Sequence, residues 1–310
     1  MKVIHHELHP EDAETVANMR EMIAAAPRPE FIPSFRPTFD EIIAYTPPAD
    51  GVDFTPGVVG GVRGWWCNPA DAVAGAAVLY LHGGGYVLGS SIAYKNLVAQ
   101  IAKRARAVSF IADYALAPEQ PFPAAPNDVE ATYNGIASLG FERIALCGDS
   151  AGGGLALSHI QRIGGRDSRL VGAVAMSPWI DLSLSGKSMV SRADEDPLIS
   201  RETLTHAAEQ FLSVSDFRDP RLQTLAGDFS QLPPIQIHVG AAEVLLDDAL
   251  RFAARAQEAD RICDVHVWAG MMHVFPSNVT MLHAARQALE GVGAFLAAFL
   301  HHSAAQQTSH

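Results

Sequence analysis

The chain has 310 residues, of which 48% are hydrophobic and 18% are charged, and this apolar fraction excludes a disordered protein. With 22 basic and 34 acidic residues the formal net charge is −12, so the chain repels phosphate backbones and nucleic acid is a poor partner. The length allows two domains of ordinary size, or one large α/β domain with an accessory lobe.

The sequence contains no segment typical of a membrane span or a secretory leader. The longest apolar runs, Ala72–Leu81 and Val292–Leu300, are shorter than the ~18 residues that a membrane span needs. The first seven residues lack the apolar stretch of a signal peptide. The three cysteines are too far apart in the chain to form a metal-ligand set and are odd in number: Cys67, Cys147 and Cys263. We therefore expect a cytoplasmic protein with no membrane partner and with buried cysteines.

The expected elements begin with a helix at Pro10–Ala26, where apolar residues recur at helical spacing. The following stretch, Pro27–Pro56, is rich in proline and aromatic residues and predicts an extended or irregular segment. Gly57–Trp66 predicts a pair of strands at the edge of a sheet.

From residue 76 onward, short apolar runs alternate with longer helix-like stretches. The runs predict strands at Ala76–Leu81, Ala107–Ala112, Ile144–Cys147, Leu170–Met176, Ile235–Val239 and Val265–Trp268. The intervening stretches predict helices at Ala93–Ala105, Ala125–Ser138, Ala151–Ile163, Leu246–Ala259 and Met281–Leu300. This alternation indicates an α/β fold with a mostly parallel central sheet flanked by helices.

One connection, between Met176 and Ile235, is too long for an ordinary crossover. We predict that Leu184–Gly227 is a cap insertion over the sheet, with a helix at Arg201–Ser213. The predicted organisation is an N-terminal cap segment (1–50), a catalytic domain (51–183 and 228–310) and the cap insertion (184–227). The candidate walls of a substrate pocket in the cap are Phe31, Phe35, Leu204, Phe211 and Leu212.

The strongest local signal for chemistry is the segment Gly148-Asp149-Ser150-Ala151-Gly152, which follows a predicted strand and precedes a predicted helix. A serine on such a tight turn has an exposed hydroxyl, and the small residues two positions before and after it allow neighbouring chain to pass closely. The spacing matches neither a dinucleotide-binding nor a phosphate-binding glycine loop. The segment therefore predicts Ser150 as a nucleophile.

A second glycine-rich loop, His82-Gly83-Gly84-Gly85-Tyr86, directly follows the strand predicted at Ala76–Leu81. Acyl transfer builds negative charge on a carbonyl oxygen, and backbone N–H groups usually stabilise it. Successive glycines expose such amides without side chains in the way, so this loop is a candidate oxyanion site.

A nucleophilic serine needs a histidine base, which in turn needs a carboxylate, and in this fold they follow in the order Ser, acid, His. Among the 13 histidines, His273 lies just past the last predicted strand and before the last predicted helix, at the correct end of the sheet. Glu243 is the first carboxylate after the strand Ile235–Val239. Asp247 and Asp248 are alternatives, although acids in the first turn of a helix often only stabilise that turn.

These motifs resemble those of the bacterial hormone-sensitive-lipase-like carboxylesterases (family IV) of the α/β-hydrolase superfamily. The resemblance runs from residue 76 to 300, and four further segments are similar: Asp113–Glu119, Pro121–Ala125, Ser177–Trp179 and Leu232–Pro234. It implies an α/β-hydrolase fold with a helical cap, Ser150 as nucleophile and His273 as base. It also implies that Glu243 is the acid, where Asp is commoner, and that the oxyanion is bound by the amides of Gly83, Gly84 and Ala151.

The resemblance further implies that the substrates are short- to medium-chain acyl esters and that the chain can form a homodimer through an edge strand. We therefore expect a serine carboxylesterase that needs no metal or organic cofactor. A lactonase or an amidase would use the same three residues. A non-catalytic ligand-binding homologue typically lacks one of them, so the presence of all three disfavours that alternative.

Overall fold

The computed structural model describes residues 2–26, 29–214 and 218–301. Residues 27–28 of the proline-rich stretch, 215–217 of the predicted cap insertion and the chain end from residue 302 lie outside the described residues.

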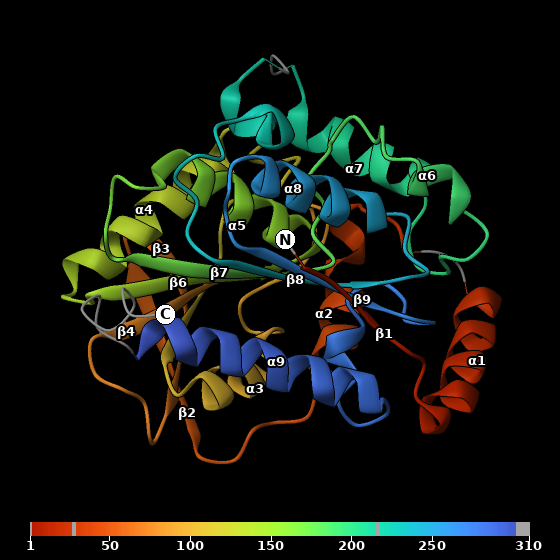
Figure 1. Ribbon diagram of the computed structural model, residues 1–310, viewed down its shortest axis with the longest axis horizontal. Helices are drawn as coiled ribbons and strands as arrows, with labels where there is room; N and C mark the ends of the chain where they lie inside the picture. Colours follow the sequence, from red (N-terminus) through yellow and green to blue (C-terminus); the bar gives the residue numbers. More distant parts are fainter. Residues whose placement is uncertain (1, 27–28, 215–217, 302–310) are drawn as a thin grey trace.

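A nine-stranded sheet forms the centre of the described part of the chain, in the order β1-β9-β8-β7-β6-β4-β5-β3-β2 (Figure 1). All neighbouring strands are parallel except that β3 runs antiparallel to both β2 and β5. The strands are β1 (Lys2–His6), β2 (Val52–Val59), β3 (Val62–Pro69), β4 (Ala76–Leu81), β5 (Val108–Ala112), β6 (Arg143–Asp149), β7 (Leu170–Met176), β8 (Ile235–Gly240) and β9 (Cys263–Trp268).

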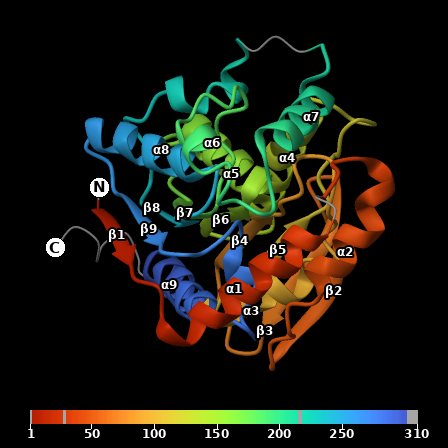
Figure 2. The same cartoon turned by 90° about the vertical axis from the view of Figure 1, so that its right-hand side faces the viewer.

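Helices cover both faces of this sheet, with α3 and α9 on one side and α4, α5 and α8 on the other (Figures 1 and 2). The α-helices are α1 (Pro10–Ala25), α2 (Arg36–Ala44), α3 (Lys95–Ala105), α4 (Ala124–Ser138), α5 (Ser150–Ile163), α6 (Ser188–Ser191), α7 (Arg201–Leu212), α8 (Leu246–Glu258) and α9 (His283–Leu300). Short 3₁₀ turns are η1 (Pro33–Phe35), η2 (Pro220–Leu222), η3 (Thr224–Ala226) and η4 (Phe275–Ser277). Within the described ranges, no helix is long and apolar enough to cross a membrane.

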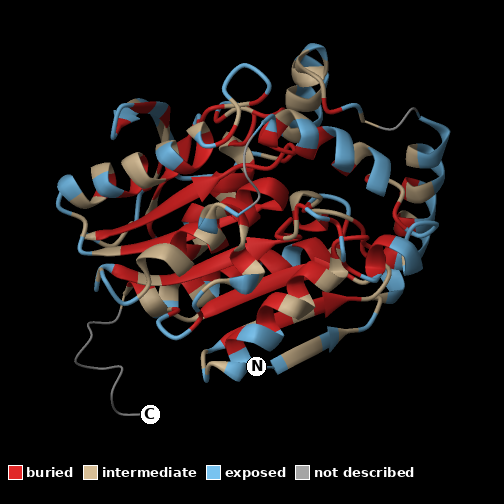
Figure 3. Ribbon diagram, turned by 90° about the horizontal axis from the view of Figure 1, so that it is seen from above, coloured by how far each residue is buried: buried red, intermediate tan, exposed pale blue. Residues whose placement is uncertain are grey.

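The central strands are buried on both faces, which is why they read as continuous apolar runs in the sequence (Figure 3). Every residue of β4 and of β8 is buried. The prediction of a mostly parallel α/β sheet flanked by helices is confirmed, and all three cysteines are buried and unpaired.

Helix α2 and strand β1 are among the elements that the sequence does not predict. The stretch predicted to be irregular contains helix α2. Pro37 is compatible with this helix because it lies in the first turn, where backbone N–H groups have no intrahelical acceptor and a missing N–H costs no hydrogen bond. The first residues form β1, which pairs in parallel with β9 and so becomes the edge of the sheet. A five-residue strand with mixed exposure has too little pattern to be recognised from sequence alone.

The N-terminal segment and the insertion contact each other. Gln210 on α7 donates through Nε2 to the carbonyl oxygen of Phe31 (2.5 Å), and Arg20 on α1 donates to the carbonyl oxygen of Glu195 (2.6 Å). Helix α7 begins at a capping box formed by Ser200 and Thr203. Strand β1 lies within the predicted cap segment 1–50 but belongs to the central sheet, so that boundary is corrected: a cap formed with residues 184–227 would contain only residues beyond β1, and it stays a proposal.

A line of hydrogen-bonded side chains ties β1 to β9 and β8. The indole of Trp268 can only donate, and it donates to His238 Nδ1 (3.2 Å). The remaining contacts are then His238 Nε2 to Gln236 Oε1 (3.0 Å), Gln236 Nε2 to His266 Nε2 (3.3 Å) and His266 Nδ1 to His6 Nε2 (2.9 Å). In this arrangement both His238 and His266 use one nitrogen as donor and one as acceptor. A proton added to His238 or His266 would turn its acceptor nitrogen into a donor, which would then face the N–H group of Trp268 or Gln236.

This line predicts that acid destabilises the protein. Burial lowers the pKa of His6, His238 and His266, so the unfolded chain takes up protons before the folded one does. The stabilisation is therefore complete above the ordinary histidine pKa of about 6.5 and is lost as the pH falls below it, by up to about 1.4 kcal/mol per pH unit for one histidine. We expect the Tm to fall more between pH 7.5 and 5.5 in the wild type than in His266→Gln. The exposed His5 on the neighbouring strand β1 provides the control, His5→Gln. Equal pH dependence in wild type and His266→Gln would contradict the prediction.

Candidate active site

Ser150 lies on the turn between β6 and α5, with a φ of 50° that non-glycine residues rarely adopt. The turn is tight enough that a Cβ at Gly152 would lie 2.0 Å from the carbonyl oxygen of Leu81, and one at Gly148 would lie 2.7 Å from the same atom. Any larger residue at position 152 would therefore displace the end of β4. The close approach holds the serine at the beginning of α5, where it is 7% exposed.

Three side chains from three different loops form a continuous hydrogen-bonded line. His273, on the loop after β9, places Nε2 2.9 Å from Ser150 Oγ and Nδ1 2.9 Å from Glu243 Oε2. Glu243, on the loop after β8, is completely buried. The structure thus brings together the serine, the histidine and the first of the candidate carboxylates.

Glu243 is satisfied by more than the histidine. Its Oε1 accepts a hydrogen bond from the backbone N–H of Gly240 (2.6 Å) and another from the hydroxyl of Ser177 (2.7 Å). A carboxylate that only accepts requires His273 to carry its proton on Nδ1, which leaves Nε2 free to accept the proton of Ser150. The contacts therefore select the tautomer that can act as a base.

The two alternative acids lie elsewhere and bind backbone amides. Asp247 Oδ2 accepts from the N–H groups of Lys187 (2.6 Å) and Ser188 (3.1 Å). Asp248 Oδ2 accepts from Ile180 and Asp181, at 2.7 and 2.8 Å. Both carboxylates secure the chain that follows β7 and contact neither the serine nor the histidine.

The pKa of His273 is raised above its ordinary value. Burial alone would lower it, but the hydrogen bond and the charge of Glu243, together with the charges of Asp196 and Asp149, outweigh that effect. A base with a raised pKa accepts a proton more readily, provided that the pH is high enough to leave it neutral.

The glycine-rich loop after β4 is held by the buried Asp149. Its Oδ1 accepts from the hydroxyl of Tyr80 (2.8 Å) and from the N–H of Gly83 (2.9 Å), while Oδ2 accepts from the hydroxyl of Tyr94 (3.1 Å). The amide of Gly83, expected among the oxyanion donors, is thus already bonded. Burial raises the pKa of Asp149 to about 6, although these three hydrogen bonds act to lower it.

The next amides of this loop are differently placed. Gly84 and Gly85 both have positive φ, at 107° and 62°. Among the hydrogen bonds of the described residues, none uses the N–H of either glycine. The N–H of Ala151 belongs to the first turn of α5, where helix amides lack intrahelical partners.

The structure gives a role to two residues for which the sequence predicts none. Ser177, noted only within a segment of family resemblance, donates to Glu243 and accepts from the N–H of Val274 (3.0 Å), so it joins the acid loop to the histidine loop. Asp149 was noted only as part of the nucleophile motif. The sequence carries no signal for either role because both depend on contacts between distant strand ends.

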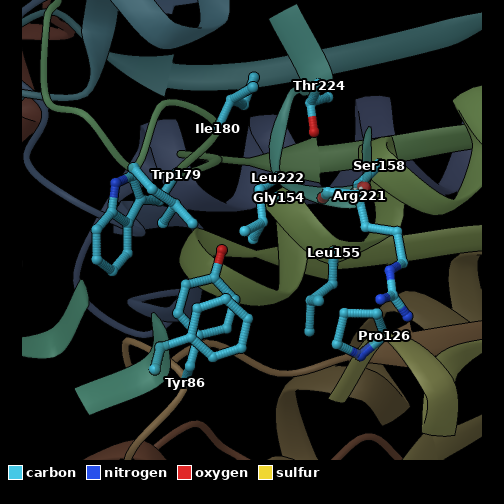
Figure 4. Close-up of a pocket in the computed structure, with 12 residues that line it drawn as sticks. Tyr86, Pro126, Gly154, Leu155, Ser158, Trp179, Ile180, Arg221, Leu222 and Thr224 are labelled. Carbon is cyan, nitrogen blue, oxygen red and sulfur yellow. Dashed lines mark hydrogen bonds between the residues drawn. The ribbon is translucent and has the colours of Figure 1, made fainter. Parts of the chain in front are cut away.

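A small cavity of about 20 Å³ lies beside α5, one helical turn beyond Ser150 (Figure 4). Tyr86, Trp179 and Phe211 line it together with Leu155 of α5. Of the predicted pocket walls in the cap, Phe211 lines this cavity, whereas the others pack in or against the hydrophobic core: Phe31, Phe35, Leu204 and Leu212.

Comparison with known proteins identifies relatives over most of the chain. A family model described as the alpha/beta hydrolase fold matches residues 78–277. An acetyl-hydrolase of Streptomyces hygroscopicus is 37% identical over 81% of this chain and 83% of its own length. An esterase of Acinetobacter venetianus is 32% identical over 84% of this chain and 88% of its own.

The solved structures agree with the sequence relatives. A crystal structure of an esterase from the bacterial hormone-sensitive lipase family is 34% identical, has a TM-score of 0.86, and aligns over 94% of this chain and 99% of its own. Together with the matched family model, this confirms the fold class and the resemblance predicted from the motifs. The chain therefore belongs to the alpha/beta hydrolase fold family and, within it, to the hormone-sensitive-lipase-like carboxylesterases of bacterial family IV.

Proposed function

We propose that this protein is a serine carboxylesterase in which Ser150 is the nucleophile, His273 the general base and Glu243 the acid that orients the base. The observation that carries the proposal is the hydrogen-bonded line from Ser150 Oγ through both nitrogens of His273 to Glu243 Oε2, with 2.9 Å at each step. It has the donor and acceptor sequence that activates a serine hydroxyl.

The reaction proceeds through an acyl-enzyme. Ser150 Oγ attacks the ester carbonyl while its proton passes to Nε2 of His273, and Glu243 stabilises the imidazolium that forms. His273 then gives this proton to the leaving alcohol. Water enters, loses a proton to the same nitrogen, and releases the acid from Ser150 by the reverse steps.

The oxyanion is bound by the amides of Gly84 and Gly85 together with that of Ala151. Gly85 replaces Gly83 in this proposal because the amide of Gly83 is bonded to Asp149. The N–H of Ala151 lies at the beginning of α5, where the helix dipole favours negative charge. In comparable sites one such donor lowers the barrier by roughly 3–4 kcal/mol.

The substrates are esters with short- to medium-chain acyl groups. Tyr86 stacks on Phe211, with ring centroids 4.0 Å apart, and lies 5.4 Å from Trp179, so an aromatic wall fills the space beyond Ser150. The cavity behind this wall holds about one water-sized group. If the acyl group points toward this wall, a long chain finds no room there, and an acetyl-hydrolase is among the relatives.

A homodimer and a cytoplasmic location, both expected from the sequence, stay proposals. The edges of the sheet in the described residues are β1 and β2, so pairing through an edge strand would use one of these two.

We expect the purified protein to hydrolyse p-nitrophenyl acetate and butyrate faster than the octanoate. Ser150→Ala removes the nucleophile and should lower kcat by roughly a thousandfold or more. The exposed serine of α4 provides the matched control, and Ser138→Ala should keep the wild-type rate. Undiminished hydrolysis by Ser150→Ala would overturn the nucleophile assignment. Faster turnover of a lactone or an anilide than of any ester would change the substrate class.

The acid is tested by comparing two substitutions of similar size. Glu243→Gln places an amide beside His273 that can stabilise the wrong tautomer, so we expect kcat to fall by roughly a hundredfold or more. Asp247→Asn affects only backbone contacts and should leave kcat within about threefold of the wild type. Steady-state kinetics on p-nitrophenyl acetate measure both, and the opposite ranking would transfer the role to Asp247.

A further inference from the structure

Val244, the residue directly after Glu243, is held on both sides of its backbone by the cap insertion. Its N–H donates to Asp196 Oδ2 (3.0 Å), and its carbonyl oxygen accepts from the hydroxyl of Ser188 (2.6 Å). Both side chains are buried, at 1% and 2% exposure. The peptide group between Glu243 and Val244 and the one that follows it are thus both fixed by residues that lie outside the sheet.

Asp196 also fixes the insertion itself. Its Oδ1 accepts from the N–H groups of Leu198 (3.0 Å) and Ile199 (3.1 Å), immediately before the N-cap Ser200 of α7. One carboxylate therefore joins the beginning of the cap helix to the loop that carries Glu243. Every group bonded to it is a backbone donor, so this geometry requires the carboxylate to act as an acceptor at both oxygens.

A second connection between the same segments leaves the Val244 amide untouched. Asp247, on the first turn of α8, accepts from Lys187 and Ser188, and its own N–H donates to the hydroxyl of Ser188 (3.0 Å). This connection anchors the insertion to α8 rather than to the acid loop. Removing it therefore shows how much the anchoring of the insertion contributes to the reaction rate when the Val244 amide keeps its hydrogen bond.

Asp196 is also close enough to the reacting groups to influence them by its charge. Its carboxylate acts on His273, whose pKa it helps to raise, and it repels that of Glu243. The charge of Asp149 also acts on His273. Burial raises the pKa of Asp196 itself, while the attraction of His273 and the backbone hydrogen bonds lower it.

We propose that Asp196 is a positioning residue for the esterase reaction, which orients Glu243 through the backbone of Val244 and makes that orientation depend on the docking of the cap insertion. The inference rests on the proposed function, because it requires Glu243 to be the acid. It implies that the cap does more than enclose substrate: the base is correctly supported only while residues 188–199 are in place.

The test is Asp196→Asn, which keeps the size of the side chain. Whichever way the amide turns, its NH₂ group faces a backbone N–H, either that of Val244 or those of Leu198 and Ile199. A displacement of the acid by a fraction of an ångström affects kcat more than KM, so we expect kcat on p-nitrophenyl acetate to fall by roughly tenfold or more, with KM within about threefold. The acid limb of the kcat/KM profile should also shift to lower pH, because one carboxylate that raises the pKa of His273 is lost.

The controls separate positioning from mere anchoring. Asp247→Ala cuts the parallel connection, because both backbone donors bond to the single oxygen Oδ2, and it should change neither kcat beyond about threefold nor the pH profile. Thermal unfolding of each variant shows whether it is folded. If Asp196→Asn folds poorly, Ser188→Ala serves as the second test: it removes the hydrogen bond to the Val244 carbonyl and should also lower kcat. Wild-type kcat and pH profile in folded Asp196→Asn, or equal losses in Asp196→Asn and Asp247→Ala, would overturn the inference. If Ser150→Ala retained full activity instead, the proposed function itself would fail.

Discussion

The structure around the site depends on one buried carboxylate. Glu243 is completely inaccessible to solvent, and a buried charge is costly unless hydrogen bonds satisfy it. Its partners come from the ends of three neighbouring strands: Gly240 from β8, Ser177 after β7 and His273 after β9. Satisfying this one group therefore fixes the relative positions of three loops, and the imidazole is oriented toward Ser150 as a consequence.

A similar arrangement holds the other half of the site. Asp149 accepts hydrogen bonds from two tyrosine hydroxyls and from the amide of Gly83, so the glycine-rich loop is attached to the residue that precedes Ser150. Gly152, in the first turn of α5, also lies close to the end of β4. Residues on both sides of Ser150 therefore contact the segment that leads into the glycine-rich loop. Two buried carboxylates thus hold His273 and the glycine-rich loop in place, and neither reacts with the substrate in the mechanism that we propose.

The sequence predicted the elements whose signals are local. The alternation of apolar runs and helices predicted the parallel sheet, and strand–turn–helix context located Ser150. Chain order selected His273 from 13 histidines and Glu243 from three carboxylates, and the structure brings those two together with the serine. What was missed depends on distant contacts: β1 forms only against β9, and the amide of Gly83 is bonded to an aspartate 66 positions away. Helix α2 was missed because a proline-rich composition concealed a helix start that proline permits.

Labelling by a fluorophosphonate tests most directly whether His273, held by Glu243, activates Ser150. The labelling rate is measured across pH, and mass spectrometry identifies the labelled residue. If His273 activates Ser150, the label forms a single adduct on Ser150, and it forms faster as the pH rises through a His273 pKa that lies above its ordinary value of about 6.5. An adduct on another residue, or a labelling rate on Ser150 that does not change as histidine loses its proton, would contradict it.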